Sequence, residues 1–268
     1  MTYEKFANQI RRETLRCINS QGSGHIGGSL SIADLLAVLY TSHMKVDPNK
    51  PKMPDRDQLV LSKGHAGPAL YATLALKKFF PMEWLDTLNK LGTRLPSHVN
   101  LNLTPGVDMT AGSLGQGLSC ACGLALAQKA QGFDNYVYVI LGDGELQEGQ
   151  NWEGAMFASA KKLDNIIVFV DNNKMQIDGY TADIMPIEDI EKKFASFGFV
   201  VDRIDGHDHA AIDSAIVAAK QDTTQSPHCI ILDTVKGKGI SFYESMGPGN
   251  HSTGVSAEQL EKALAELN

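Results

Sequence analysis

The feature that most constrains the fold is a segment, residues 136–173, in which two apolar runs are joined through a helical stretch. The first run, YVYVIL, leads into the turn GDG at 142–144, and the second, IIVFV, ends in DNN at 171–173. Two parallel strands connected through a helix have this order, and ligands bind at the carboxyl ends of such strands. Neighbouring strands lie about 4.8 Å apart, so polar side chains at their tips can share one ligand. The segment predicts a parallel sheet with a polar site at its carboxyl edge.

The same alternation continues through the rest of the chain, where stretches of helical periodicity separate short β-branched runs. It predicts the α/β class, with a mostly parallel sheet covered by helices on both faces. Because the runs are apolar throughout, we expect every strand to be buried on both faces. Strands are predicted at Gln58–Leu61, Tyr136–Leu141, Ile166–Val170, Phe199–Ile204 and Cys229–Thr234. Helices are predicted at 3–19, 31–43, 67–79, 82–91, 114–131, 150–161, 187–197, 208–220 and 257–266.

Two local patterns refine these expectations. Ser31 followed by Asp34 resembles a capping box at the start of the second helix. Residues 235–256, with GKG, GPG and NHS, lack periodicity and predict an irregular active-site loop, the alternative being a disordered stretch ahead of the last helix. No repeat and no linker rich in Ser, Pro and Gly divides the sequence, so a single domain over residues 1–268 is expected.

The charge balance disfavours nucleic acid and membrane as partners. The chain carries 24 basic and 31 acidic side chains without a basic run, which is not the pattern of a nucleic-acid-binding protein. Its first 17 residues lack the apolar core of a signal peptide, and no segment reaches membrane-spanning length, so we expect a cytoplasmic protein. Four cysteines without a CxxC spacing are expected to be reduced core thiols: Cys17, Cys120, Cys122 and Cys229.

Asp143 and Asn173 are the candidate ligands of a hard cation. They follow the two strands of the segment 136–173 and lie 30 residues apart (173 − 143). Mg²⁺ takes oxygen ligands of this kind together with phosphate oxygens, and the glycines beside Asp143 allow backbone amides to approach a phosphate. The alternative is that these residues only form turns at the strand ends. It would explain GDG alone or DNN alone, but not both motifs at this spacing. A dinucleotide site is disfavoured because GDGELQ lacks the third glycine.

Three further motifs place histidines beside glycines or at turns: SGHIGG at 23–28, SKGHA at 62–66 and SH at 97–98. A fourth, TAGSLGQG at 110–117, follows them. Each histidine alone could be structural. Together with GDG and NN, however, the series resembles the transketolase family, in which SGHPG, NGHA, GHPE, TGPLGQG and GDG follow one another. The resemblance spans most of residues 20–180, whereas GDG and NN alone are also shared by 2-oxo acid dehydrogenases.

This resemblance implies a cofactor, thiamine diphosphate, bound with Mg²⁺, for which Ca²⁺ or Mn²⁺ could substitute. The metal would be held by Asp143, the side chain of Asn173 and the backbone carbonyl of Met175. Neutral histidines facing the reactive carbon and the sugar could hydrogen-bond hydroxyls and move protons. The implied catalytic residues are His25, His65, His98 and His251. The implied cofactor-binding residues are His65, Gly112, Leu114, Asp143, Gly144, Glu148, Asn173 and His251.

The resemblance also implies a partner. Transketolases resemble three α/β domains, of which only the diphosphate-binding one is represented here. The pyrimidine-binding domain, with its essential glutamate, and the C-terminal domain are therefore expected on another chain, with two copies of each chain in the assembly. Glu148 aligns with an acidic residue at the interface between cofactor sites in relatives, although a glutamate is also favourable at a helix N-terminus. The implied activity is transfer of a two-carbon ketol unit from a phosphorylated ketose to an aldose, as in pentose phosphate metabolism.

The sequence departs from the family pattern at two places, and alternatives stay open. Ile26 replaces a proline, and SHVN at 97–100 replaces GHPE, which predicts an altered acceptor pocket. His207 and Asp208 could reach the rim of the site or cap the helix that follows. One alternative function is the α-type subunit of a 2-oxo acid dehydrogenase, which should lack the histidine motifs. The other is a non-catalytic cofactor-binding subunit.

Overall fold

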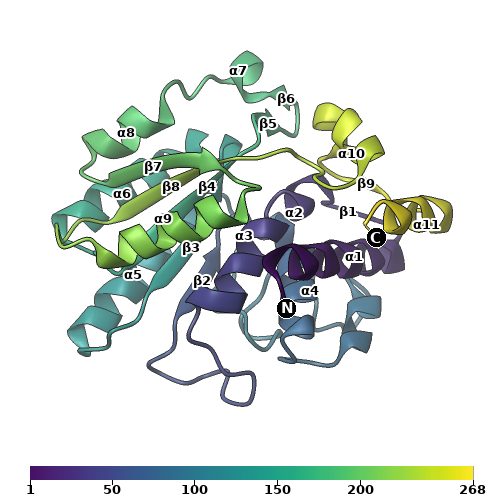
Figure 1. Ribbon diagram of the computed structural model, residues 1–268, viewed down its shortest axis with the longest axis horizontal. Coiled ribbons are helices and arrows are strands. Elements are labelled where there is room, and N and C mark those ends of the chain that lie inside the picture. The colour runs from purple at the N-terminus through teal and green to yellow at the C-terminus, as the bar shows by residue number, and fades with distance from the viewer. Residues whose placement is uncertain (268) are drawn as a thin grey trace.

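A five-stranded parallel sheet runs through the centre of the structure, a computed structural model that describes residues 1–267 (Figure 1). The strand order is β2-β3-β4-β8-β7, and each neighbouring pair is parallel. The α/β class and all five strand predictions are confirmed. The strands are β2 Gln58–Leu61, β3 Val137–Gly142, β4 Ile166–Asn172, β7 Val200–Asp205 and β8 His228–Asp233.

Helices cover both faces of this sheet. Two short antiparallel pairs lie outside it: β1 Ser23–Gly24 with β9 Thr253–Gly254, and β5 Met175–Gln176 with β6 Gly179–Tyr180. The helices are α1 Tyr3–Gln21, α2 Gly27–Leu30, α3 Ala33–Val38, α4 Gly67–Leu76, α5 Gln116–Ala130, α6 Gly149–Ala160, α7 Thr181–Ile184, α8 Ile190–Ser196, α9 His209–Gln221, α10 Ser241–Ser245 and α11 Ala257–Glu266.

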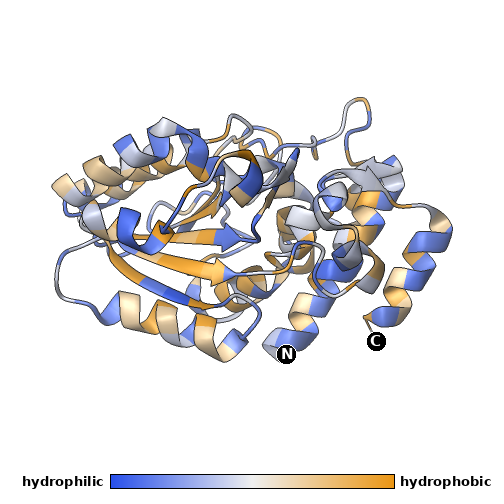
Figure 2. Ribbon diagram, turned by 90° about the horizontal axis from the view of Figure 1, so that it is seen from above, coloured by the Kyte–Doolittle hydropathy of each residue, from blue (hydrophilic) through white to orange (hydrophobic). Residues whose placement is uncertain are grey.

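Alternate residues of each central strand enter two separate hydrophobic cores. In β3, Tyr138 and Ile140 pack with α1, α3, α4 and α9, whereas Val139 and Leu141 pack with α5, α6 and α8. Figure 2 shows the orange, apolar strands between helices that carry blue, polar positions. The central runs are apolar throughout because both faces are covered. Burial on both faces is a wrong prediction for β7, which lies at the edge of the sheet and keeps half-buried and exposed residues.

The predicted second helix, 31–43, is largely confirmed: it begins at Ala33 as α3 and ends in a π-helical turn, Leu39–His43, while the short helix α2 precedes it. Its predicted capping box is wrong. The Ser31 hydroxyl donates to the carbonyl of Gly28 at 3.2 Å and to Asp171 at 2.8 Å instead of capping. Asp34 is turned toward the guanidinium of Arg11, because a buried carboxylate is stabilised more by an opposite charge than by a helix amide.

Two further segments differ from the expected helices and loops. The predicted helix at 82–91 is a 3-10 helix, Met82–Thr87. Residues 235–256 are not irregular throughout, since they contain α10, a 3-10 turn at Gly247–Asn250 and β9. In β9, Gly254 pairs with Ser23 of β1, and this pairing joins the two ends of the chain.

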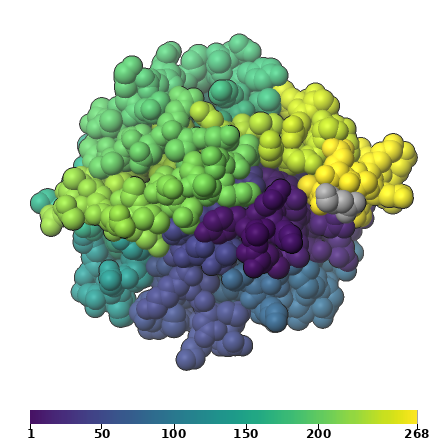
Figure 3. All heavy atoms as spheres, in the orientation of Figure 1, coloured from purple at the N-terminus to yellow at the C-terminus, as the bar shows by residue number. Residues whose placement is uncertain are grey.

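The N-terminal helix α1 lies against the C-terminal helix α11 on one face of the molecule, as Figure 3 shows in purple and yellow. Thr2 caps α1, and Gly22 ends it in the left-handed conformation, with φ of 88°. Among residues 1–267, no helix combines the length and apolarity needed to cross a membrane.

Candidate active site

The GDG and DNN motifs lie side by side at the carboxyl edge of the sheet. Strands β3 and β4 are neighbours, and Gly142 at the end of β3 is paired with Asp171 at the end of β4. A cavity of about 260 Å³ opens at this edge. Eight of the predicted site residues line it: His65, Leu114, Asp143, Gly144, Glu148, Asn173, Met175 and His251. Two cations that the sequence analysis did not single out, Lys63 and Lys236, line it as well.

Four histidine rings from four separate segments meet beside this cavity. The ring centroid of His25 lies 5.3 Å from that of His65, 5.6 Å from that of His98 and 5.5 Å from that of His251. The His65 and His251 rings lie 5.1 Å apart. The pairing of β1 with β9 brings His25 to His251, since one follows β1 and the other precedes β9. All four predicted histidines therefore belong to one cluster, which we call the histidine cluster.

Burial keeps three of these imidazoles uncharged. It lowers the pKa of His25, with further contributions from His98 and Lys236. It lowers the pKa of His251 to about 3, aided by Lys236, and that of His65 well below its usual range, aided by Lys63. A neutral imidazole has one N–H donor and one acceptor nitrogen. These rings can therefore donate a hydrogen bond to a hydroxyl group or accept one from it.

Asp143 is fixed at the tip of β3 by backbone amides. One carboxylate oxygen accepts from Gly144 N–H at 2.8 Å, and the other accepts from Lys174 N–H. Burial, together with the nearby Asp171, raises the pKa of Asp143 to about 7. A side chain at position 144 would begin 3.0 Å from Gln176 Cβ, so any larger residue there would force Gln176 to move. A buried carboxylate with so few charge partners is suited to a cation.

Asn173 and Met175 add oxygen atoms next to Asp143. The Asn173 amide donates to Asp171 at 2.9 Å, and its carbonyl accepts from Met175 N–H at 3.1 Å, so the side chain has one orientation. The ammonium of Lys236 lies 3.5 Å from the Met175 carbonyl and 3.1 Å from His251 Nδ1. Burial and the charge of Lys63 lower the pKa of Lys236 to about 8.

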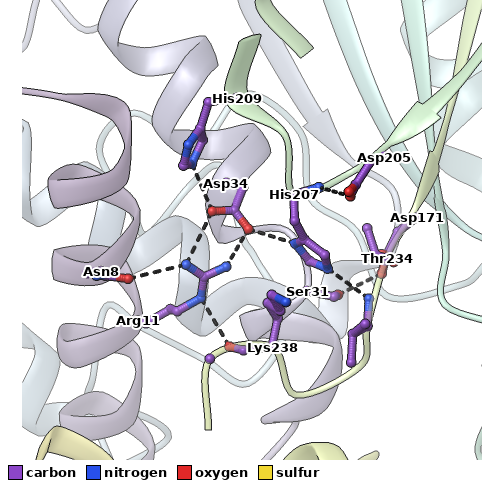
Figure 4. A network of polar contacts seen from close by, with 12 residues as sticks. Asn8, Arg11, Ser31, Asp34, Asp171, Asp205, His207, His209, Thr234 and Lys238 are labelled. Carbon is purple, nitrogen blue, oxygen red and sulfur yellow. Dashed lines mark hydrogen bonds and ion pairs between the residues drawn. The ribbon is translucent and has the colours of Figure 1, made fainter. Parts of the chain in front are cut away.

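Beneath the cavity, a fully buried ion pair joins Lys63 to Asp171. Asp171 also accepts hydrogen bonds from Ser31 and Thr234 (Figure 4). Burial by itself would raise the pKa of Asp171, but Lys63 and these hydroxyls lower it below its usual value. Sequence analysis missed the pair. The signal available was Lys63 in SKGHA, a lysine in an otherwise small and apolar turn.

Glu145, which was also missed, connects three motifs. Its buried carboxylate accepts from the Ser62 hydroxyl, from Gly115 N–H at 2.8 Å and from Gly142 N–H at 3.0 Å. Burial raises its pKa. The residue thereby fixes the SKGHA and GSLGQG loops to the GDG turn.

The remaining candidates lie at the rim or outside the cavity. Gly112 lines an adjacent hollow with Thr110 and Cys120 and approaches His98, from which a side-chain Cβ would be 3.6 Å. Glu148 is exposed at the start of α6. Asp208 caps α9, as one reading of its motif predicts. His207 does not line the cavity and instead contacts Asp34 and the backbone of Val235.

The cysteines lie apart from this cavity. All four that the structure describes are free thiols, and Cys17, Cys122 and Cys229 are buried, as expected of core residues. Cys120 is half-buried. Burial raises the pKa of Cys122 to about 12, so that this thiol is unreactive.

The arrangement combines three chemical capacities in one place. Asp143, Asn173 and the Met175 carbonyl could hold a hard cation, because all three offer oxygen. Lys63 and Lys236 offer positive charge to a phosphate group. The histidine cluster could bind and deprotonate hydroxyl groups of a substrate.

Comparisons with known proteins identify the family of this chain. Residues 2–267 match the family model described as transketolase, thiamine diphosphate binding domain. The chain is 54% identical to the 6-deoxy-6-sulfo-D-fructose transketolase subunit SqwG of Clostridium sp. (strain MSTE9), over 97% of this chain and 94% of that protein. It is 38% identical to one of the subunits of the apulose-4-phosphate transketolase of Actinobacillus succinogenes, over 98% and 95%. The transketolase structure from Leishmania mexicana superposes with a TM-score of 0.95 at 32% identity, over all of this chain and 41% of that one.

Proposed function

This chain belongs to the transketolase family as a thiamine-diphosphate-binding domain, and on that premise we propose that it is one subunit of a two-chain transketolase. The observation that carries the proposal is the histidine cluster beside the oxygen-lined cavity. The histidine motifs and the family match favour this function over the α-type subunit of a 2-oxo acid dehydrogenase. We propose that residues 1–268 form a single domain.

We propose that thiamine diphosphate and Mg²⁺ bind in the cavity. When bound, the cofactor supplies a nucleophilic carbon and an electron sink for cleavage of a carbon–carbon bond. Asp143, the Asn173 side chain and the Met175 carbonyl would hold the metal. Gly144 would supply a backbone amide to the diphosphate, and Gly112, Leu114, His65 and His251 would contact the cofactor. The charges of the cavity support this fit. Burial raises the pKa of Asp143, whose charged form a bound cation would stabilise, and lowers the pKa of Lys236, whose charged form a bound anion would stabilise.

We assign proton transfer and hydroxyl binding to the histidine cluster. His25 and His98 would contact the sugar, and His65 and His251 would lie between the sugar and the cofactor. Each neutral ring can accept a proton from a substrate hydroxyl at one nitrogen while it donates from the other. The ring centroids lie 5.1–5.6 Å apart in tilted and edge-to-face contact, so the rings would present their outward-facing nitrogens to the sugar hydroxyls.

We propose that the partner subunit carries the pyrimidine-binding and C-terminal domains. The lengths of related proteins support a partner subunit. This chain spans nearly all of two relatives that are named as subunits, but only 41% of the Leishmania transketolase chain. Two copies of each chain would give a closed two-fold assembly. Glu148, exposed at the rim of the cavity, would then face a neighbouring subunit. We expect the assembly to be cytoplasmic.

For the donor, we propose a ketose with an anionic end group. The 54% identical relative is named for 6-deoxy-6-sulfo-D-fructose, which makes this sulfonate the first candidate and a ketose phosphate the second. A sulfonate and a phosphate share anionic oxygens that basic side chains recognise. The departures from the family pattern at Ile26 and at residues 97–100 lie close to the histidine cluster, where they could alter the acceptor pocket.

The test is an assay of this chain with its partner, thiamine diphosphate and Mg²⁺. We expect ketol transfer from 6-deoxy-6-sulfo-D-fructose to an aldose phosphate, and no turnover by either chain alone. Fructose 6-phosphate serves as the comparison donor. Cofactor binding without turnover of either donor in the assembled complex would favour a non-catalytic subunit. Turnover by this chain alone would contradict the two-chain proposal.

A further inference from the structure

A short backbone segment, Val235–Lys238, carries Lys236 into the cavity and is fixed from four directions. We call it the anchored segment. Each of its four residues makes a hydrogen bond to a different part of the chain, so that its position is set by elements far apart in sequence. The four bonds are Val235 N–H to His207 Nε2 (2.8 Å), Asn250 Nδ2 to the Lys236 carbonyl (2.9 Å), Gly237 N–H to the Gly27 carbonyl (3.0 Å) and Arg11 Nε to the Lys238 carbonyl (3.1 Å).

Asp34 connects the two outer bonds of this set. Its carboxylate accepts from the guanidinium of Arg11, which holds Lys238, and from His207 Nδ1 at 2.7 Å, whose other nitrogen holds Val235 (Figure 4). His209 adds a third contact, at 2.9 Å. The Asp34 carboxylate thus orients both Arg11 and His207, the two side chains that hydrogen-bond the ends of the anchored segment.

The hydrogen bonds of His207 require one tautomer of its ring. To donate from Nδ1 to Asp34, the neutral ring must carry its proton on Nδ1, which leaves Nε2 as an acceptor. Nε2 is the atom to which Val235 N–H donates. A carboxylate that selects the tautomer of a histidine in this way also fixes the ring orientation.

Stability alone is a weak explanation for this cluster. Asp34 is 3% exposed, and burial of its charge opposes the contacts of His207, His209 and Arg11 that lower its pKa. Buried ion pairs often contribute little net stability compared with an apolar packing of the same volume. A buried carboxylate whose partners hold the backbone on both sides of Lys236 is better explained by the geometry it imposes.

We propose that Asp34 and His207 are positioning residues that hold the ammonium of Lys236 at the cofactor phosphate. The direct contact is made by Lys236, which lies beside Met175 O and His251 Nδ1, and the two positioning residues act through the backbone at Val235 and Lys238. This inference rests on the proposed function for the identity of the anion. The DGHD turn thereby acquires a role in the site, although His207 itself does not line the cavity.

The experiment compares His207→Ala with His209→Ala in the assembled two-chain enzyme. Both variants remove one histidine contact from Asp34, but only His207 touches the anchored segment. Two quantities are measured: amide hydrogen exchange over residues 234–239 and the dissociation constant for thiamine diphosphate at saturating Mg²⁺. We expect His207→Ala to accelerate exchange at Val235 and to weaken cofactor binding about five- to tenfold, as the loss of one neutral hydrogen bond implies. His209→Ala should change neither by more than about twofold.

A second comparison assigns the effect to Lys236. Lys236→Met should weaken cofactor binding without accelerating exchange in the anchored segment, and adding His207→Ala to it should cause little further loss of affinity. His207→Gln, whose carbonyl can accept from Val235 N–H, should restore part of the binding. Additive losses in the double variant, or equal effects of His207→Ala and His209→Ala, would overturn the inference.

The same data separate this inference from the proposed function. A wild-type assembly that does not bind thiamine diphosphate would contradict the proposed function and, with it, the cofactor role of Lys236. If the wild type binds the cofactor and the variants bind it equally well, the proposed function stands and the positioning role is wrong. Thermal unfolding of each variant shows that the fold is retained, which we expect because three of the four anchors remain.

Discussion

The rings of His65 and His251 lie 5.1 Å apart, although 186 residues (251 − 65) separate them in the chain. His65 is placed by the SKGHA turn after β2, and His251 by the turn before β9. Two loops from opposite ends of the sequence therefore form one wall of the cavity. Because we assign His65 and His251 to the cofactor side and His25 and His98 to the sugar, we expect mutation to separate cofactor binding from turnover.

Replacing His98 or His25 by Ala should reduce turnover by about 10²–10⁴-fold, because a positioned acid–base group is lost. Neither residue lines the oxygen-rich part of the cavity, so affinity for thiamine diphosphate should change little. Calorimetry and steady-state kinetics on the assembled enzyme measure the two quantities. His228→Ala, which removes an imidazole paired with Asp222 away from the cavity, is the control and should keep its turnover. Parallel losses of affinity and turnover in the His98 variant would mark its role as structural.

Asp143→Ala should abolish Mg²⁺-dependent binding of thiamine diphosphate while the chain stays folded. The carboxylate contributes little to the core, since it is held by two backbone amides at a strand tip. Titration calorimetry with and without Mg²⁺ measures the effect. Asp178→Ala is the matched control, because Asp178 is a nearby but exposed acid. Unchanged cofactor affinity in the Asp143 variant would remove this residue from the metal site.

Acidification should destabilise the cofactor-free chain through His65. Burial lowers the pKa of His65 in the folded state well below its usual value, whereas in the unfolded chain it titrates near about 6.5. Below about pH 6.5 only the unfolded chain takes up this proton, so the folded state loses stability as the pH falls, by up to about 1.4 kcal/mol per pH unit. Urea unfolding should show a shallower loss for His65→Gln than for the wild type. Equal slopes below pH 6.5 would argue against a neutral, buried His65.

Lys63→Met should destabilise the fold by about 3–5 kcal/mol, because it leaves the buried charge of Asp171 without its cation. Combining it with Asp171→Asn should recover part of the loss, since the stranded charge is then removed. Chemical denaturation measures both. Lys45→Met, which breaks the exposed pair with Asp55, is the control and should have almost no effect. A Lys63 variant as stable as the control would mean that Asp171 is protonated in the fold.

The strands β2, β3, β4 and β8 could be predicted from sequence because each is mainly a run of apolar residues that a covered sheet buries, and β7 because its apolar start lies between two helical stretches. The proximity of Asp143 and Asn173 followed from the same pattern, since parallel neighbours bring their carboxyl ends together. The capping box at Ser31 failed for a reason the sequence does not reveal. Asp34 is near Arg11 only after α1 has packed against α3, and this contact outweighs the local one.

The meeting of the four histidines came from the family order of motifs rather than from periodicity. Lys63, Lys236 and Glu145 were missed because each is a single charged residue without a period or a spacing partner. Their roles depend on which loops approach one another in three dimensions. The edge position of β7 had a signal in the sequence, because Asp202 and Arg203 interrupt its apolar run, whereas the full strand order depends on the three-dimensional fold.

The pairing of β1 with β9 has a consequence for how the chain acquires its fold. Ser23 and Gly254 are separated by 231 residues (254 − 23), so their contact closes one of the longest loops that this sequence can form. Contacts of such sequence separation carry a large closure entropy and form late in folding. During synthesis, all five strands of the sheet are translated before residue 254 is added. The histidine cluster therefore cannot assemble until the C-terminal segment has been made and β9 has paired with β1.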